Sequence, residues 1–179
     1  MMQPCVLSHV VFPKDLEFLY ETMTADDQYL FSTKLKFWSI HAFEQWIMFK
    51  LKMDFHDFFI IKDRSNDRKI GYAYNYDFSL KHGHCKLVIY IVPEHREKSI
   101  GAFAAIEFIS YLFENYPLRK LYSTIYAYNS ESLKSNLAAG FVEEGILKEY
   151  RYYDGEMHNI HYLSLSRQAY EQNMRKWVK

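Results

Sequence analysis

One segment combines an apolar run, positive charge and a glycine in an order that suits phosphate binding. Residues 87–92 form the apolar run, residues 93–101 carry Arg96 and Lys98, and a second apolar stretch continues to Phe113. This order predicts a buried strand, a short turn and the start of a helix. The first turn of a helix leaves backbone N–H groups unpaired and carries the positive end of the helix dipole. We therefore expect a phosphate to bind at this turn.

A second group of residues whose side chains could take part in binding follows a predicted strand at 120–128. Asn129 comes directly after this strand, Ser132 stands three residues later, and Gly140 and Phe141 close the segment. Asn accepts hydrogen bonds from N–H groups at a helix start, and Gly is favoured just past a helix end. A short helix is therefore predicted between them. Its expected inward residues are Leu133 and Leu137.

The elements between these two groups should bring them together. The strands at 87–92 and 120–128 are separated by one helix, so we expect them to pair in parallel as a βαβ unit. The first of these strands does not alternate between apolar and polar residues, which is typical of a strand covered on both faces. The helix after Ser99 is apolar nearly all round and should be largely buried against the sheet.

Further helices and strands are predicted before this unit. Asp15 can cap a helix with one apolar face, and another helix should begin after Ser39. Two strands joined by a turn are expected at 57–62 and 69–78, and the second alternates tyrosines with small or polar residues.

The C-terminal part reads as a hairpin and a helix. Asp154 and Gly155 form a strong hairpin signal between strands at 141–153 and 157–165. A terminal helix is expected over residues 166–177. Its predicted inward residues are Tyr170, Met174 and Trp177.

Composition excludes several classes of protein. The 179 residues suit one domain, and 22 basic residues balance 22 acidic ones, which argues against nucleic acid as the main partner. Cys5 and Cys85 are far apart and in no metal-ligand spacing, which favours reduced thiols in a cytoplasmic protein and no metal site. The first residues do not resemble a signal peptide, and the apolar runs are too short to cross a bilayer. We therefore expect no membrane partner.

With these residues in this order, the chain resembles the GNAT acetyltransferase superfamily. The family's acyl-CoA signature is Arg or Gln, two residues, Gly, one residue, and Gly or Ala, directly after a strand. Arg96 and Gly101 match it, and Ser99 stands where Gly is usual. The second signature is matched by Asn129, Ser132, Gly140 and Phe141. The C-terminal half is similar to the branch of ribosomal-protein N-terminal acetyltransferases and spermidine acetyltransferases. The residues that indicate this branch are Glu144, Gly145, Asp154, Gly155 and Tyr162.

The resemblance implies acetyl-CoA as co-substrate, bound between the two parallel strands. The pyrophosphate would lie on the backbone amides of residues 97–102, with Arg96 or Lys98 adding positive charge. Pantetheine would pair with the backbone near Ile91 and Val92, where one amide faces the thioester carbonyl. The implied cofactor-binding residues are Ile91, Val92, Arg96, Glu97, Lys98, Ser99, Ile100, Gly101, Ala102, Asn129, Ser132 and Asn136.

The resemblance leaves the catalytic base and acid unassigned. Many relatives place a glutamate at the start of the central strand, and that position is Lys86 here. Several relatives carry a tyrosine in the short helix to protonate the departing thiolate. That position is Asn136, which can hydrogen-bond the sulfur but cannot act as an acid. Ser123 and Thr124 on the neighbouring strand offer no carboxylate, so a bound water relaying a proton is one alternative.

Other polar residues near the expected site have two interpretations. Asp26 and Asp27 could attract a cationic amine, because relatives build the acceptor pocket from this region, or could be a solvated loop pair. Tyr128 could contact cofactor or substrate, or could pack at its strand end. His82 and His84 are most simply part of a solvated turn.

The expected fold is α/β: a single-domain GNAT-like mixed sheet, mostly antiparallel, with a central parallel strand pair splayed around acyl-CoA and flanked by helices. Residues 1–179 would form one N-acetyltransferase domain. Its expected parts are acceptor-side helices at 15–53, an acyl-CoA core at 84–141 and a C-terminal hairpin and helix at 141–178. The implied activity is acetyl transfer to a primary amine of a small molecule or a peptide N-terminus. The alternative is a catalytically silent acyl-CoA-binding or regulatory module. A homodimer is a further expectation from relatives.

Overall fold

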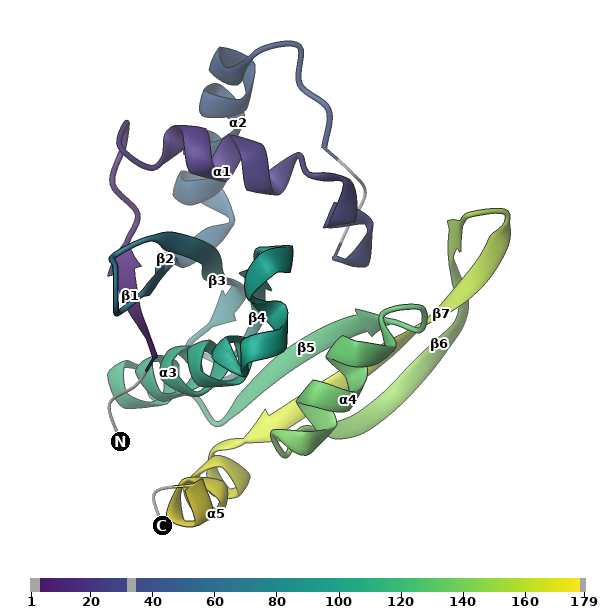
Figure 1. The fold of residues 1–179 in the computed structure, drawn as a ribbon. Helices are drawn as coiled ribbons and strands as arrows, with labels where there is room; N and C mark the ends of the chain where they lie inside the picture. The colour runs from purple at the N-terminus through teal and green to yellow at the C-terminus, as the bar shows by residue number, and fades with distance from the viewer. Residues whose placement is uncertain (1–3, 32–34, 178–179) are drawn as a thin grey trace.

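In the computed structural model, which describes residues 4–31 and 35–177, seven strands join into one mixed sheet (Figure 1). The strands are β1 (Cys5–His9), β2 (Phe55–Asp63), β3 (Lys69–Ser79), β4 (His84–Ile91), β5 (Lys120–Tyr126), β6 (Val142–Tyr153) and β7 (Glu156–Ser166). Their spatial order is β1-β2-β3-β4-β5-β7-β6. All neighbours run antiparallel except β4 and β5, which are parallel. The predicted α/β class and the central parallel pair are therefore confirmed.

The described residues contain five α-helices and two short 3-10 helices. They are α1 (Leu16–Met23), η1 (Asp26–Leu30), α2 (Ile40–Met53), η2 (Pro93–Lys98), α3 (Ile100–Asn115), α4 (Ser130–Ala138) and α5 (Arg167–Trp177). Every α-helix lies where the sequence predicts one. The sequence reasoning missed β1, η1 and η2, because elements of five or six residues show no periodic pattern. The side chains of Glu97, Lys98, Met174 and Trp177 lie outside the described residues.

The helix caps agree with the sequence in one case and differ in another. The Ser39 hydroxyl accepts a hydrogen bond from the Ala42 N–H at 3.1 Å, as expected for a helix that begins after Ser39. Asp15 precedes α1, but its carboxylate accepts from the Val11 N–H and forms an ion pair with Lys69 at 2.7 Å. Its backbone is already helical, with φ −102° and ψ −2°, whereas a capping residue is normally extended. The predicted side-chain cap by Asp15 is therefore wrong.

The sheet is covered on both faces because successive strand residues point in opposite directions. Phe58 and Ile60 of β2 join α1 and α2 in one apolar cluster, while Phe59 and Ile61 join α3 in another. The tyrosines of β3 follow the same alternation, and Tyr72 packs with α1 and α2. This arrangement leaves α3 on the face opposite the two N-terminal helices.

The β6–β7 hairpin extends away from the rest of the sheet (Figure 1). Asp154 and Gly155 have positive φ angles of 50° and 82°, as the predicted tight turn requires. Next to it, α4 has no fully buried residue. Leu133 packs on the core as predicted, but Leu137 is 46% exposed. The prediction of an inward Leu137 is wrong, because Ala139 rather than Leu137 contacts the core at this end of the helix.

The structure places no membrane-spanning element in its helices. None of the helices in residues 4–31 and 35–177 is long and apolar enough to cross a bilayer. Both cysteines, Cys5 and Cys85, are buried free thiols, as predicted.

Candidate functional site

The parallel strands β4 and β5 pair only at their beginnings. Cα partners are His84 with Lys120, Cys85 with Leu121, and Lys86 with Tyr122. Within the described strands the register ends there, although β4 continues to Ile91 and β5 to Tyr126. The two strands therefore splay apart, as predicted. Backbone groups along the splayed edges need another partner, and an extended ligand can supply one.

The splayed ends of β4 and β5 leave a gap between the two strands. The alternating hydrogen bonds between β3 and β4 determine which backbone groups of β4 face this gap. The Val92 N–H donates to the Ile70 oxygen at 2.9 Å, so this donor points toward β3. The backbone groups of Ile89 and Ile91 then point the other way, toward β5. The predicted backbone contact to pantetheine is therefore compatible with the N–H of Ile91 and with Ile89, whereas the Ile91 oxygen already accepts from the Arg96 Nε at 2.9 Å. It does not fit the N–H of Val92, which is already bonded within the sheet.

The turn before α3 is where the sequence predicts that a phosphate binds. Ser99 has φ 57° and ψ 2°, a left-handed conformation in which glycine is favoured, which explains why relatives have Gly there. The N–H groups of Ala102 and Phe103 both donate to the Ser99 oxygen, at 3.1 and 3.2 Å. The Ser99 side chain makes no capping hydrogen bond. Among the residues that the structure describes, the N–H groups of Ile100 and Gly101 have no acceptor, as is typical of the first turn of a helix.

Gly101 is not required by the packing around it. A methyl group added at this position would lie 3.7 Å from the Ile91 side chain, an ordinary contact. Gly101 is absent from the glycines with positive φ, so the backbone at this position does not demand glycine either. Nothing in the described part of the folded chain therefore requires glycine at this position. A ligand that comes close to the backbone would require it.

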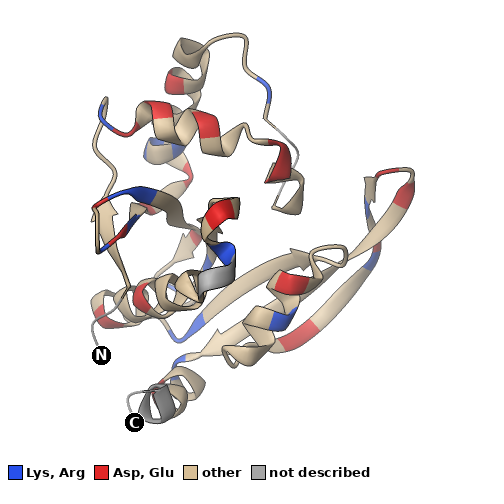
Figure 2. Cartoon of the chain, in the orientation of Figure 1, with Lys and Arg blue, Asp and Glu red and all other residues tan. Residues whose placement is uncertain are grey.

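Arg96 is held at the open end of the gap. Its Nε donates to the Ile91 oxygen at 2.9 Å, and its guanidinium forms an ion pair with Asp27 of η1. Asp27 also accepts a hydrogen bond from the Tyr90 hydroxyl at 3.2 Å. Burial and the charge of Asp27 raise the pKa of Tyr90. In Figure 2, η1 carries acidic residues in red, and η2 carries a red and a blue segment. Sequence spacing gave no signal for this contact.

The start of α4 lies on the β5 side of the gap. The Asn129 side-chain oxygen accepts from the Ser132 N–H at 3.3 Å, which confirms the predicted cap. The Asn129 amide nitrogen donates to the Leu30 oxygen at 3.2 Å, and that of Asn136 donates to the Ser132 oxygen at 2.9 Å. These bonds bring the three predicted pantetheine-contacting residues Asn129, Ser132 and Asn136 into one continuous chain of hydrogen bonds.

Lys86 lies at the base of the gap, where β4 and β5 are still paired. Its ammonium forms an ion pair with Asp77 at 3.0 Å. Burial alone would lower the pKa of Lys86, but the hydrogen bond and charge of Asp77 outweigh burial and raise it. Lys86 therefore stays protonated at neutral pH and cannot accept a proton from an amine.

A hydroxyl pair that the sequence reasoning did not connect lies near Lys86. The side chain of Tyr76 in β3 reaches across β4 to the side chain of Thr124 in β5, which partly offsets the effect of burial on the Tyr76 pKa. Burial raises the pKa of Tyr76, which keeps the hydroxyl protonated. The alternation of tyrosines in β3 indicated their common face, but only the sheet order brings Tyr76 to Thr124.

Tyr76 also lines a groove of about 650 Å³ on the α2 side of the sheet. The groove is formed by the end of α2, the start of β2 and the end of β3. Its lining residues are Lys50, Lys52, Met53, Asp54, Phe55, His56, Tyr74, Tyr76, Asp77 and Phe78. Aromatic walls and charges of both signs meet in this groove, next to the base of the gap.

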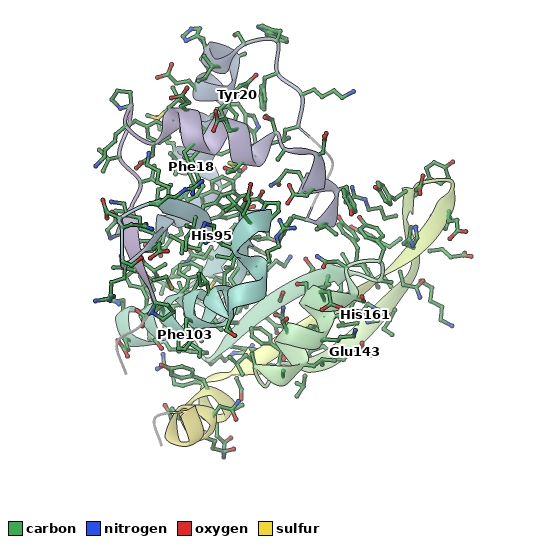
Figure 3. The ribbon with its side chains drawn as sticks, viewed as in Figure 1. Phe18, Tyr20, His95, Phe103, Glu143 and His161 are labelled. Atoms are coloured by element: carbon green, nitrogen blue, oxygen red, sulfur yellow. The ribbon has the colours of Figure 1, made fainter. Side chains whose placement is uncertain are left out.

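Three further candidates make contacts within the fold. Tyr128 donates to the Tyr29 oxygen, and the His82 and His84 rings stack with centroids 6.1 Å apart. Figure 3 shows Glu143 of β6 and His161 of β7 close together, and their side chains pair at 2.7 Å. This pair lies on the two outermost strands of the C-terminal half and is separate from Lys86.

A splayed parallel pair next to a helix N-terminus defines a class of acyl-CoA-binding α/β proteins, and sequence comparison names the family. The model of the acetyltransferase (GNAT) domain matches residues 9–161, which is most of the chain. The chain therefore belongs to the GNAT acetyltransferase family. This family transfers acetyl groups from acetyl-CoA, so the predicted class of enzyme and its co-substrate are confirmed at the level of the family.

Curated relatives from Bacillus subtilis (strain 168) are similar to this chain. The uncharacterized N-acetyltransferase YoaA is 25% identical over 105 residues, which span 59% of this chain and 59% of YoaA. The SPbeta prophage-derived uncharacterized N-acetyltransferase YokL is 21% identical over 135 residues, 75% of each chain. The match to YoaA thus covers less than two thirds of that protein.

Solved structures share the fold. The spermidine N-acetyltransferase from Vibrio cholerae, solved with CoA and spermine, has a TM-score of 0.84 at 20% identity, over 95% of this chain and 99% of that chain. A probable GNAT-family acetyltransferase from Chromobacterium violaceum has a TM-score of 0.79 at 16% identity, over 96% and 87% of the two chains. At these identities the likeness confirms the GNAT fold.

Proposed function

We propose that this chain is an acetyl-CoA-dependent N-acetyltransferase that modifies a primary amine of a small molecule or a peptide N-terminus. The observation that carries the proposal is the gap between β4 and β5, which opens beside the first turn of α3. Pantetheine would lie in the gap against Ile89 and Ile91. The pyrophosphate would lie on the amides of Ile100 and Gly101, with the other predicted residues of 96–102 around it.

In the proposed reaction the neutral amine attacks the thioester carbonyl. A C–N bond forms, the C–S bond breaks, and the thiolate of CoA leaves with the electron pair, while the nitrogen loses one proton to the thiolate or to water. A backbone N–H in the gap would stabilise the negative charge that develops on the carbonyl oxygen. Removing the proton from an alkyl ammonium with an ordinary pKa costs about 4.6 kcal/mol at pH 7. Lys86 cannot accept that proton, so we propose that the amine enters deprotonated or passes its proton to water.

Several expectations about the acceptor and the assembly belong to this proposal. Polyamines are the first acceptors to test, because the Vibrio cholerae relative was solved with spermine. Asn129, Ser132 and Asn136 would contact the pantetheine arm. We also propose that residues 1–179 act as one domain, in the cytoplasm, and as a homodimer. Light scattering of the purified chain tests the dimer.

The proposal is tested by mixing the protein with acetyl-CoA and a panel of polyamines, aminosugars and peptides while thiol release is measured. CoA binding is measured in parallel by calorimetry. Replacing Gly101→Trp should abolish binding by filling the approach to the amides, while Gly101→Ala should preserve the fold, since its methyl group meets only an ordinary contact at 3.7 Å. Unchanged CoA affinity in Gly101→Trp would remove phosphate binding at the turn before α3 from the proposal.

A catalytically silent acyl-CoA-binding module is a second candidate. The protonated Lys86, paired with Asp77 at 3.0 Å, is the observation that favours it, because no carboxylate base occupies that position. Tight CoA binding without thiol release on any amine would support this candidate. Thiol release that depends on one class of amine would eliminate it.

A further inference from the structure

Arg96 and Asp27 form an ion pair between two 3-10 helices that are far apart in sequence. Arg96 belongs to η2 and Asp27 to η1, and their side chains are 35% and 18% exposed. The Arg96 Nε is bonded to the Ile91 oxygen at 2.9 Å, so the guanidinium is fixed next to the splayed end of β4. A partly shielded and oriented pair is stronger than the average surface pair.

Tyr90 holds Asp27 from a second side. The buried Tyr90 ring places its hydroxyl 3.2 Å from the Asp27 carboxylate, and the Arg96 guanidinium lies over the same ring, 5.4 Å from its centroid. The carboxylate thus receives hydrogen bonds from both a guanidinium and a phenol. A phosphate oxygen makes the same kinds of contact with the same donors.

The segment that carries Asp27 is also tied to the other side of the gap. The Tyr29 oxygen accepts from the Tyr128 hydroxyl at 2.8 Å, and the Leu30 oxygen accepts from the Asn129 amide at 3.2 Å. η1 therefore reaches from the β4 side, through Asp27, to the β5 side, through Tyr29 and Leu30. A change at Arg96 would be transmitted to the entrance of the gap.

We propose that Asp27 is an internal competitor for Arg96, and that the pyrophosphate of acetyl-CoA displaces its carboxylate from the guanidinium. This proposal rests on the proposed function, because it requires the cofactor to reach Arg96. In the free protein the Asp27 carboxylate pairs with the Arg96 guanidinium, where a phosphate of the cofactor would bind. When the cofactor binds, one anion replaces another at the same cation, and Asp27 becomes available to a cationic acceptor.

The competition predicts a specific pattern of CoA affinities in a double-mutant cycle. Asp27→Asn keeps the size of the side chain and an acceptor for Tyr90, but removes the competing charge. It should bind CoA roughly two- to fivefold more tightly, the effect expected from a partly exposed ion pair. Arg96→Gln should bind CoA more weakly than the wild type. In the Arg96→Gln background the added Asp27→Asn change should have no effect, because the competition has been removed.

Glu94→Gln is the matched control, since it removes the same charge from η2. Glu94 is close enough to raise the pKa of Tyr90, yet within the described residues it makes no ion pair with Arg96. Calorimetry with CoA should show a smaller gain for this variant than for Asp27→Asn. The proposal is overturned if Asp27→Asn binds CoA no more tightly than Glu94→Gln, or if its gain persists without Arg96.

A second variant covers the case in which Asp27→Asn does not fold. Tyr90→Phe removes only the hydroxyl that holds Asp27 and should shift CoA affinity in the same direction, and unchanged affinity would contradict the competition. Failure of the proposed function gives a different result, because the wild-type chain would then bind no CoA at all or, as a silent module, would bind CoA without releasing thiol from acetyl-CoA and any amine. Circular dichroism of each variant establishes that the fold is present.

Discussion

Tyr128, just past the end of β5, donates its hydroxyl hydrogen to the backbone oxygen of Tyr29 in η1, 2.8 Å away. The Tyr29 ring stacks on Tyr153 of the hairpin, with centroids 4.9 Å apart and an angle of 2° between the planes. Burial raises the pKa of Tyr128 to about 12, so the hydroxyl remains a donor at neutral pH. η1 is therefore anchored on an aromatic cluster that joins β5 to the hairpin.

Replacing Tyr128→Phe should loosen η1 while keeping the ring contacts. Loss of this hydrogen bond should lower the free energy of unfolding by about 1 kcal/mol, and the Tyr29 oxygen would then accept from water. Hydrogen exchange measured by mass spectrometry should become faster at the amides of Gln28 and Phe31, which close the turns of η1. Tyr152→Phe is the control, because Tyr152 is 70% exposed. Equal exchange in the two variants would refute the anchoring role of Tyr128.

Ser99→Gly should stabilise the protein. The left-handed backbone of Ser99, with φ 57°, costs a residue with a side chain about 1 to 2 kcal/mol, and glycine avoids this cost. The greater freedom of glycine in the unfolded chain offsets part of the gain, so we expect a net increase of roughly 0.5 kcal/mol in the free energy of unfolding. Urea denaturation measures it. Ser99→Ala keeps the strained backbone, and a gain of the same size in that variant would exclude this explanation.

Two strand glycines should respond differently to alanine. A methyl group added at Gly71 of β3 would lie 2.1 Å from the Tyr90 backbone oxygen, and no atom lies within 4 Å of one added at Gly145 of β6. The Tyr90 oxygen belongs to β4 and cannot move without disturbing the β3–β4 ladder. Gly71→Ala should lose more than about 3 kcal/mol of stability, while Gly145→Ala should change by less than about 0.5 kcal/mol. Thermal melts of the two variants give the comparison, and similar melting temperatures would be the contrary result.

The two cysteines should be unreactive in the folded protein. Burial raises the pKa of Cys5 to about 11 and that of Cys85 to about 12, from a model-compound value of 9.0. At pH 8 a thiol-reactive disulfide should modify neither cysteine in the native chain and both in urea. Because the folded pKa values are raised, their contribution to stability is complete below pH 9.0 and is lost as pH rises toward 11. Rapid labelling of the native chain at pH 8 would contradict this prediction.

Local signals account for most of the fold that the sequence predicted. Ser39 and Asn129 cap their helices with their own side chains, and Asp154 and Gly155 form the hairpin turn. Such signals act within a few residues, so they are legible without the tertiary structure. Asp15 shows their limit, because a nearby backbone N–H and Lys69 take the carboxylate that the sequence assigns to a cap.

The amino-acid sequence by itself determined the order of the five α-helices and of strands β2 to β7, the parallel βαβ unit and the residues at the turn before α3. Periodicity, caps and turn residues depend on neighbours along the chain, and the charges of Arg96 and Lys86 were visible at once. Only the tertiary structure decided what these charges contact. Asp27 meets Arg96, and Tyr76 crosses β4 to reach Thr124, because strand order and register bring together residues that no local pattern relates. The same register turns the N–H of Val92 into the sheet and leaves Ile89 and Ile91 facing the gap.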